Sequence, residues 1–242
     1  MDAIRVVVGG SQGRMSRCLS ETIQQDPTLS LIAQTDRYQG GLAAITAPFD
    51  IFIDFTHPTA VEDHLALCCE RQRRMVIGVT GLSEAQKERI KQASKKIPIV
   101  FSPNMSLGIN LSFKLLEMAA QTLNHELEGI AIQEIHHKYK QDIPSGTALK
   151  MGEIIANARG KPLEKSDISF ASSRVAEVMG EHTVLFALMG EQLEIKHKTE
   201  DRTIFARGAI CASKWLMHQP PGLYDMQDVL GLRFKTKDSR LC

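Results

Sequence analysis

The sequence predicts an α/β protein of two domains: a parallel sheet with helices on both faces, then an α+β domain with a mixed, largely antiparallel sheet. In roughly the first hundred residues, short apolar runs alternate with segments of helical periodicity, the order expected of a doubly wound sheet. Runs such as IFIDF and MVIGV are almost wholly apolar, which is typical of strands covered on both faces. After Pro103, several segments alternate apolar and polar residues instead, as strands with one open face do.

Strands and helices are expected in both domains. In the first domain we expect strands at 4–8, 29–34, 51–55, 75–79 and 97–101, and helices at 16–25, 59–73 and 84–96. The change of character places a domain boundary near residue 105. Beyond it we expect helices at 109–123 and 147–158 and strands at 129–136, 183–189, 192–197 and 203–210. A Pro-Pro-Gly interruption and a late helical pattern follow in 215–232.

Composition narrows the class of partner. The chain has 242 residues, of which 43% are hydrophobic and 24% charged, and its formal net charge is +1. This balance provides no global field toward nucleic acid or a membrane surface, so we expect neither as a partner. No apolar run reaches the length of about 18 residues that a membrane-spanning helix needs.

Cysteine usage indicates a reducing compartment. The five cysteines are odd in number, two of them are adjacent, and none has a metal-binding spacing. Cys68 and Cys69 lie in an apolar run and are predicted to be core thiols. The N-terminal residues enter a strand pattern at once, without the features of a signal peptide. We therefore expect a cytoplasmic protein.

A glycine-rich turn indicates a nucleotide site. Gly10, Gly13 and Ser16 occupy the turn after the first strand and the start of the first helix, in a variant of the fingerprint of Rossmann-like, dinucleotide-binding domains. Glycine lets the backbone approach a pyrophosphate, which the helix N-terminus favours. Ser16 stands where a glycine would permit the closest packing, and Gly9 remains an alternative member of the turn.

Asp36 strengthens this interpretation because it follows the second strand, where a carboxylate accepts the ribose hydroxyls of NAD. Arg37 beside it suits the 2′-phosphate of NADP, so we expect NADH or NADPH as cofactor. The alternative is a solvated Asp-Arg pair in a loop. Two further strand ends, 78–81 and 102–105, carry short polar sequences that either contact the nicotinamide or form ordinary turns.

The stretch 134–149, EIHHKYKQDIPSGTAL, carries the candidate chemistry. Histidine suits proton transfer near neutral pH, and in an extended chain His136, Lys138 and Lys140 would share one face. Zinc is the alternative for the histidine pair, but adjacent histidines rarely share an ion and no third ligand is evident, so we expect no metal.

The end of this stretch predicts an anion cradle. Ser145 is the expected N-cap of the next helix, with the amides of Gly146 and Thr147 free for a carboxylate or phosphate. Simple capping is the alternative, and Asp142 either orients a lysine or caps the turn. On the later segments, His182 and Arg207 are expected in ion pairs on the sheet surface, and the alternatives are support of an anionic substrate or contacts between subunits.

These residues resemble the 4-hydroxy-tetrahydrodipicolinate reductase family, also called dihydrodipicolinate reductase, of bacterial diaminopimelate and lysine synthesis. The stretch above resembles its signature, and the likeness extends over nearly the whole chain through VVVGGSQGRM, FIDFTHP, VIGVTG, FSPNMSLGIN, GEHTVLF, GEQLEIKH and GLYDMQDVLGL. The resemblance implies a homotetramer built through the second domain's sheet, and a C-terminal segment that returns to the first domain. The domains would then be 1–105 with 214–242 for the dinucleotide, and 106–213 for substrate and oligomerisation.

The resemblance also implies residue roles. His136 matches the proton donor or acceptor and Lys140 the proton donor. The implied substrate contacts are His137, Ser145, Gly146 and Thr147. The implied cofactor contacts are Gly10, Ser11, Gln12, Gly13, Arg14, Met15, Asp36, Arg37, Gly78, Val79, Thr80, Ser102, Pro103, Asn104 and Met105.

The implied reaction is hydride transfer to a cyclic imine dicarboxylate, followed by protonation. The chain departs from the family at Ser16, in a shortened region after Tyr38, and at 167–178, which lacks much of a Gly/Arg-rich loop. Two other functions remain open at this point: an aspartate-dehydrogenase-like reductase and a non-enzymatic nucleotide sensor.

Overall fold

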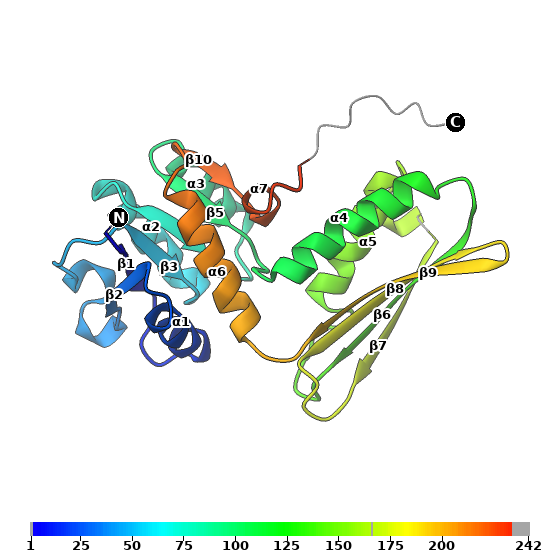
Figure 1. The fold of residues 1–242 in the computed structure, drawn as a ribbon, viewed down its shortest axis with the longest axis horizontal. Coiled ribbons are helices and arrows are strands. Elements are labelled where there is room, and N and C mark those ends of the chain that lie inside the picture. Colours follow the sequence, from blue (N-terminus) through cyan, green and yellow to red (C-terminus); the bar gives the residue numbers. More distant parts are fainter. Residues whose placement is uncertain (1, 166, 234–242) are drawn as a thin grey trace. The chain divides into compact units, whose positions relative to one another are not determined.

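The computed structural model describes residues 2–165 and 167–233, which fold as two units (Figure 1). The first unit comprises Met1–Leu107 and Arg202–Cys242, and the second Gly108–Asp201. The chain therefore returns to the first unit before residue 214, with the helix that begins at Thr203.

The first unit is a parallel sheet of six strands in the order β10-β5-β4-β3-β1-β2. Its strands are β1 (Ile4–Val8), β2 (Leu29–Gln34), β3 (Ile51–Asp54), β4 (Arg74–Ile77), β5 (Pro98–Phe101) and β10 (Gly222–Tyr224). Its helices are α1 (Arg14–Gln24), η1 (Arg37–Gln39), η2 (Gly41–Ala44), α2 (Pro58–Glu70), α3 (Glu84–Ala93), α6 (Thr203–Leu216) and α7 (Met226–Val229). The doubly wound sheet predicted from the apolar runs is confirmed.

Side chains along each strand point alternately to the two faces of the sheet, so the core of this unit has two layers. Val6 and Val8 pack with α1, α6 and α7, whereas Val7 and Phe52 pack with α2 and α3 on the opposite face. Because both faces are covered, the inner strands are mostly apolar, which explains the continuous apolar runs, and the buried Asp54 in β3 is paired with His64 at 2.7 Å.

Helix α6 corrects the expectation of a strand at 203–210. Its buried residues include Ala206, Ala209, Ile210 and Ser213, and this spacing follows the helical period. Gly208 lets the helix approach closely, since a Cβ at this position would lie 1.7 Å from the carbonyl oxygen of Met105. Arg207 consequently lies on a helix rather than on a sheet surface.

The second unit is a four-stranded sheet in the order β7-β6-β8-β9, covered on one face by two helices. Strands β6 and β7 are parallel and the other pairs are antiparallel. The elements are α4 (Leu107–Thr122), β6 (Leu127–His136), α5 (Gly146–Ala158), η3 (Leu163–Lys165), β7 (Ile168–Arg174), β8 (Gly180–Leu188) and β9 (Glu191–Thr199). The mixed, largely antiparallel sheet is confirmed; the pattern had not indicated β7.

The other face of this sheet stays open in the single chain. Ile132 and Val184 are fully buried under the helices, whereas Ala131, Ile135 and Leu185 on the opposite side are partly exposed.

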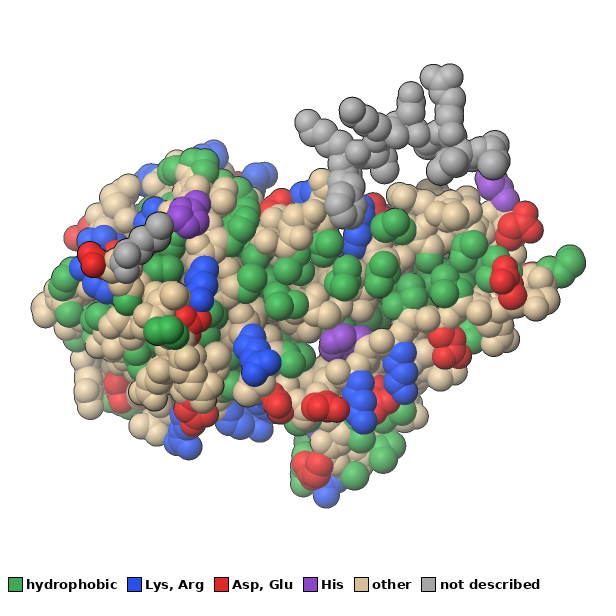
Figure 2. Space-filling model, viewed as in Figure 1, with side chains coloured by type: hydrophobic (Ala, Val, Ile, Leu, Met, Phe, Trp, Pro, Cys, Tyr) green, Lys and Arg blue, Asp and Glu red, His purple; other side chains and the backbone are tan. Residues whose placement is uncertain are grey.

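Helix α4 also presents an exposed apolar side, and Figure 2 shows hydrophobic side chains gathered over it. The members of this stripe, at helical spacing, are Leu107, Leu111, Leu115 and Met118.

Four cysteines are described, and all four are free thiols: Cys18, Cys68, Cys69 and Cys211. Cys68 is buried as predicted, and its burial raises the pKa of the thiol, whereas Cys69 is partly exposed. Cys242 lies outside the described residues. Within residues 2–165 and 167–233, no helix combines the length and apolarity that crossing a membrane requires.

Candidate active site

The candidate site of the second unit lies at the end of strand β6. Because side chains alternate along a strand, Glu134 and His136 point to the face that the helices cover, with 1% and 10% of their side chains exposed. The chain then turns, since the Lys140 amide donates to the carbonyl of His137 at 3.1 Å. The expectation of an extended chain carrying His136, Lys138 and Lys140 on one face is therefore wrong.

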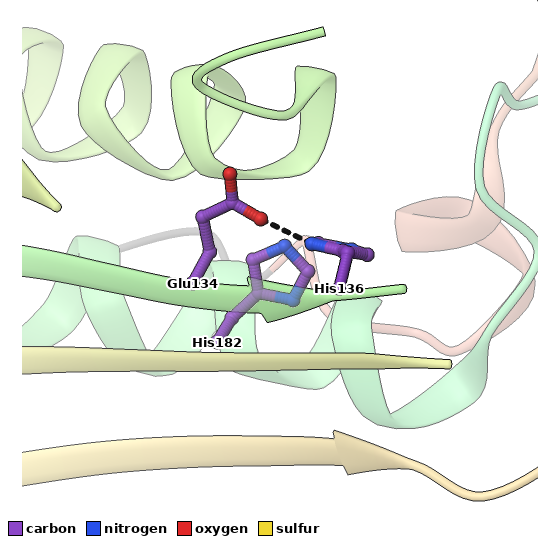
Figure 3. Close-up of side chains that lie close together, drawn as sticks. All are labelled: Glu134, His136 and His182. Atoms are coloured by element: carbon purple, nitrogen blue, oxygen red, sulfur yellow. Dashed lines mark hydrogen bonds and ion pairs between the residues drawn. The ribbon is translucent and has the colours of Figure 1, made fainter. Parts of the chain in front are cut away.

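Glu134 is the centre of the buried hydrogen bonds. One carboxylate oxygen accepts from Nδ1 of His136 (Figure 3). The other accepts from Nη2 of Arg174 at 2.9 Å and from the amide of Ser145 at 3.3 Å. Burial would raise the pKa of Glu134, but hydrogen bonds from Arg174, Ser172 and His136 outweigh burial and lower it. Glu134 is thus an ionised carboxylate held by donors.

These contacts determine the protonation state and the tautomer of the His136 ring. Burial lowers the pKa of His136 against the opposing effect of Glu134, so the neutral ring predominates at neutral pH. Since Nδ1 donates to the carboxylate, Nε2 carries the lone pair. Gly180 leaves room for this nitrogen, because a Cβ at residue 180 would lie 3.0 Å from it. His136 is therefore arranged to accept a proton at Nε2.

A second histidine packs against the first. The rings of His182 and His136 meet edge to face with centroids 5.0 Å apart, and burial is the main cause that lowers the pKa of His182 to about 4. Nε2 of His182 lies 3.1 Å from the hydroxyl of Ser145, which also caps α5 by accepting from the amide of Ala148 at 3.2 Å. The expectation of a surface ion pair for His182 is wrong, because this strand position faces the helices.

The same three side chains could in principle hold a metal ion. Ligand atoms of Glu134, His136 and His182 lie within 4.8 Å of one another (Figure 3). A metal ion at Glu134 would face the guanidinium of Arg174, which already lies 2.9 Å from the carboxylate. The donor set therefore fits a hydrogen-bonded acid–base network better than a metal site.

Lys140 and the start of α5 form the anion cradle. Nζ of Lys140 lies 2.8 Å from one oxygen of the Asp142 carboxylate, and the amide of Gly146 donates to the other at 3.3 Å. Burial would raise the pKa of Asp142, but the bond and charge of Lys140 outweigh it and lower the pKa. A carboxylate of the chain itself thus fills the cradle expected to take one from a ligand.

The other two predicted substrate contacts lie beside this cradle. Thr147 is partly exposed in the first turn of α5. Nδ1 of His137 is buried and has no hydrogen-bond partner within the described ranges, and the ring lies 6.2 Å from that of Tyr139. The structure therefore brings His137, Lys140, Gly146 and Thr147 into one short segment after β6.

In the first unit, the glycine turn and Asp36 meet at the ends of β1 and β2. Gly10 has a φ of +81°, a conformation that glycine adopts without strain, and its amide donates to the hydroxyl of Thr35 at 2.8 Å. The Asp36 carboxylate accepts from the hydroxyl of Ser11 at 3.2 Å. Ser16 fits in place of glycine because its buried hydroxyl donates to the carbonyl of Gly9 at 2.8 Å.

The start of α1 and Arg37 lie next to these strand ends. The N-cap of α1 is Gly13, which has no side chain to cap the helix, so the backbone amides there face the turn. Nη2 of Arg37 lies 2.5 Å from the hydroxyl of Tyr38, and its guanidinium lies 4.6 Å from the centre of that ring. Gln12, Arg14 and Met15 belong to the same turn and the first turn of α1.

The predicted contacts after β4 and β5 lie at the same edge, because all strands of this sheet are parallel. A Cβ at Gly78 would lie 2.4 Å from the ring of Phe55, so only glycine fits there without rearrangement. Val79 is buried and Thr80 exposed, and the hydroxyl of Ser102 donates to the carbonyl of Asn104 at 2.8 Å, across Pro103. Met105 is 1% exposed, so its side chain belongs to the core.

Sequence reasoning missed Glu134 and Arg174 as members of the site. For Glu134 a signal existed, because a residue two positions before His136 shares its face in a strand. Arg174 has no local signal: it lies beside His136 only because β7 pairs with β6 in parallel register.

Comparisons with known proteins agree with this organisation. Residues 4–105 match the family described as dihydrodipicolinate reductase, N-terminus, and residues 108–230 match its C-terminus. The chain is 44% identical over 266 aligned positions to the 4-hydroxy-tetrahydrodipicolinate reductase of Pseudomonas fluorescens, covering 94% of this chain and 99% of that protein.

Among solved structures, the chain is similar to a dipicolinate-bound dihydrodipicolinate reductase from a Paenisporosarcina species. The TM-score is 0.78 at 25% identity, with 93% of this chain and 98% of that chain covered. A probable dehydrogenase from Thermotoga maritima has a TM-score of 0.60 at 9% identity, covering 95% and 93% of the two chains, and shares the fold alone.

Proposed function

The chain belongs to the dihydrodipicolinate reductase family, and from this premise we propose how its residues carry out the family's reaction. It reduces 4-hydroxy-tetrahydrodipicolinate to tetrahydrodipicolinate with NADH or NADPH, a step of lysine and diaminopimelate biosynthesis in which the 4-hydroxyl leaves as water before hydride transfer. Family membership decides against an aspartate-dehydrogenase-like reductase and against a nucleotide sensor without activity.

The first unit fits a dinucleotide. The uncapped start of α1, the glycine at residue 78 and the carboxylate of Asp36 supply the backbone access and the ribose acceptor that such a cofactor needs. The residues that would hold it are those of the four loops, 10–15, 36–37, 78–80 and 102–105. When bound, the nicotinamide supplies the hydride for C4 of the cyclic imine dicarboxylate.

The second unit supplies the grip on the substrate and the proton. The observation that carries this assignment is the Asp142 carboxylate between the Gly146 amide and the Lys140 ammonium, since a substrate carboxylate needs the same two donors. His137 and Thr147 lie beside these two donors in the sequence, and Ser145 stabilises the start of α5 by capping the helix.

Two residues divide the proton work. Lys140 is charged and partly exposed, with 24% of its side chain accessible, so it suits donation to the electron-rich ring left by hydride transfer. His136 is neutral with its lone pair at Nε2, so it suits accepting a proton and passing it on.

Replacing Lys140 with alanine tests this assignment. We expect turnover to fall by about 10²- to 10⁴-fold, the range for loss of a proton-transfer group, while circular dichroism stays unchanged. Lys150→Ala is the control, because Lys150 is an exposed lysine of α5 paired with Glu153 at 3.1 Å. Full turnover in Lys140→Ala would remove this residue from the mechanism.

For the assembly, we propose a homotetramer in the cytoplasm built on the open face of the second unit's sheet. Partly exposed apolar residues on that face, such as Ile135 and Leu185, support it. Light scattering tests the assembly: a mass four times that of the chain is expected, and a monomer at all concentrations would refute it.

A further inference from the structure

The side chain of Arg174 bonds both the Glu134–His136 pair and the segment that carries Lys140. Arg174 is the last residue of β7 and lies directly opposite His136 in the parallel register with β6. Its guanidinium donates to Glu134 at 2.9 Å, to the carbonyl of Lys140 at 3.2 Å and to the carbonyl of Asp142 at 2.5 Å. Only 14% of the side chain is exposed.

The first of these bonds acts on the histidine. Glu134 has 1% of its side chain exposed, and a buried carboxylate without a cation takes up a proton. The charge of Arg174 therefore keeps Glu134 ionised, and the ionised carboxylate accepts from Nδ1 of His136. Through Glu134, Arg174 keeps the lone pair of His136 on Nε2.

The other two bonds act on the segment that carries the lysine. The carbonyls of Lys140 and Asp142 lie in the segment between β6 and α5, which belongs to neither a helix nor a strand. Two donors from one planar group fix this segment to the end of the sheet. The ammonium of Lys140 is thereby presented at the start of α5, beside the Gly146 amide.

We propose that Arg174 is a positioning residue that holds the proton acceptor His136 and the proton donor Lys140 in register with each other. This inference rests on the proposed function, because it assigns Arg174 a purpose in the same reaction. The segment 167–178, in which the Gly/Arg-rich loop is shortened, thus still supplies the arginine that organises the site. A lysine cannot replace it, since one ammonium does not span a carboxylate and two carbonyls as a forked guanidinium does.

The test compares Arg174→Ala, Arg174→Lys and the control Arg159→Ala with the wild-type enzyme in steady-state NADPH oxidation. Arg159 suits as control because it lies just past the opposite end of α5, where it bonds Asn124 at 3.1 Å. We expect kcat of Arg174→Ala to fall about 100-fold, the loss typical of displaced catalytic groups, with KM for NADPH unchanged. Added guanidinium at low, non-denaturing concentration restores part of this activity.

The pH profile separates positioning from general destabilisation. The charged and titratable groups that face His136 are Glu134, Lys140, Arg174 and His182, and among them Glu134 has the largest effect, which raises the pKa of His136. In Arg174→Ala, Glu134 takes up a proton and this effect is lost, so the limb of the kcat/KM profile that reports His136 moves to lower pH. In Arg174→Lys the charge remains, so the limb stays in place while kcat still falls.

Two results overturn the inference: wild-type kcat in Arg174→Lys, or a loss in Arg174→Ala that leaves the pH limb unmoved and is not rescued by guanidinium. If Arg174→Ala does not fold, Arg174→Lys alone decides by the same kcat criterion. A wild-type enzyme that oxidises no NADPH with the substrate would instead refute the proposed function.

Discussion

Removal of the Asp142 carboxylate is predicted to tighten dicarboxylate binding. In the free enzyme this carboxylate is held by Lys140 at 2.8 Å and by the Gly146 amide at 3.3 Å, so a ligand carboxylate must displace it. The pair has side chains 24% and 54% exposed, and such pairs contribute about 0.2–1 kcal/mol. A long, exposed hydrogen bond adds about 0.5 kcal/mol. Displacement therefore costs about 1 kcal/mol, equivalent to about a fivefold change in Kd.

The assay is isothermal titration calorimetry of pyridine-2,6-dicarboxylate with wild type and Asp142→Ala. The expected result is a Kd about fivefold lower in the variant, at a loss of up to about 1 kcal/mol in the free energy of unfolding. Glu153→Ala is the matched control, because it removes a carboxylate paired with Lys150 at 3.1 Å on the exposed side of α5. An equal or higher Kd in Asp142→Ala would show that the carboxylate does not compete with the ligand.

Three further predictions follow from the first unit. Gly208→Ala places a Cβ 1.7 Å from the Met105 carbonyl oxygen, so urea unfolding is expected to show a loss of about 1–3 kcal/mol. Asp26→Asn is expected to lower the free energy of unfolding, because it removes a carboxyl whose pKa is lowered from 3.8 to about 2. The largest cause of this lowered pKa is the hydrogen bond from Lys214. Its stabilisation of about 0.2–1 kcal/mol is present above pH 3.8 and lost as pH falls through about 2. Arg37→Ala is expected to raise KM for NADPH about tenfold by removing a charge-assisted contact to the 2′-phosphate.

Each of these has a control and a contrary outcome. Gly152→Ala should cost less than the change at residue 208, because its Cβ meets the movable ring of Phe170 at 2.7 Å; the reverse order would contradict the packing argument. Asp26→Asn should match wild type in stability once the pH is well below 2, and a difference that persists there would contradict the linkage. For Arg37→Ala the control is NADH, whose KM should stay unchanged; an equal rise for both cofactors would deny a phosphate contact.

The first unit was predictable from sequence because its strands are buried on both faces. An apolar run such as 51–55 allows few other interpretations, and the expected boundaries lie within about two residues of β3. Helix α6 was misread because Thr203, Ile204 and Phe205 favour strands, while the buried positions follow the helical period. Packing of these buried positions against the sheet therefore favours a helix over a strand.

The second unit was less predictable because its site depends on contacts between distant residues. Local patterns located His136, the cap at Ser145 and the helix that follows. They did not locate Arg174, whose place opposite His136 depends on the parallel pairing of two strands with α5 between them. They also did not show that Asp142 occupies the cradle, since this requires a turn that the extended chain lacked.

The central claim is that the segment after β6 reduces a cyclic imine dicarboxylate with a bound nicotinamide cofactor. The most direct measurement follows the absorbance of NADPH and of NADH after adding freshly prepared 4-hydroxy-tetrahydrodipicolinate to the purified protein. The account predicts substrate-dependent oxidation of both cofactors by the wild-type chain and its near loss in Lys140→Ala. Absence of oxidation by the wild type with either cofactor, or full activity in that variant, would contradict it.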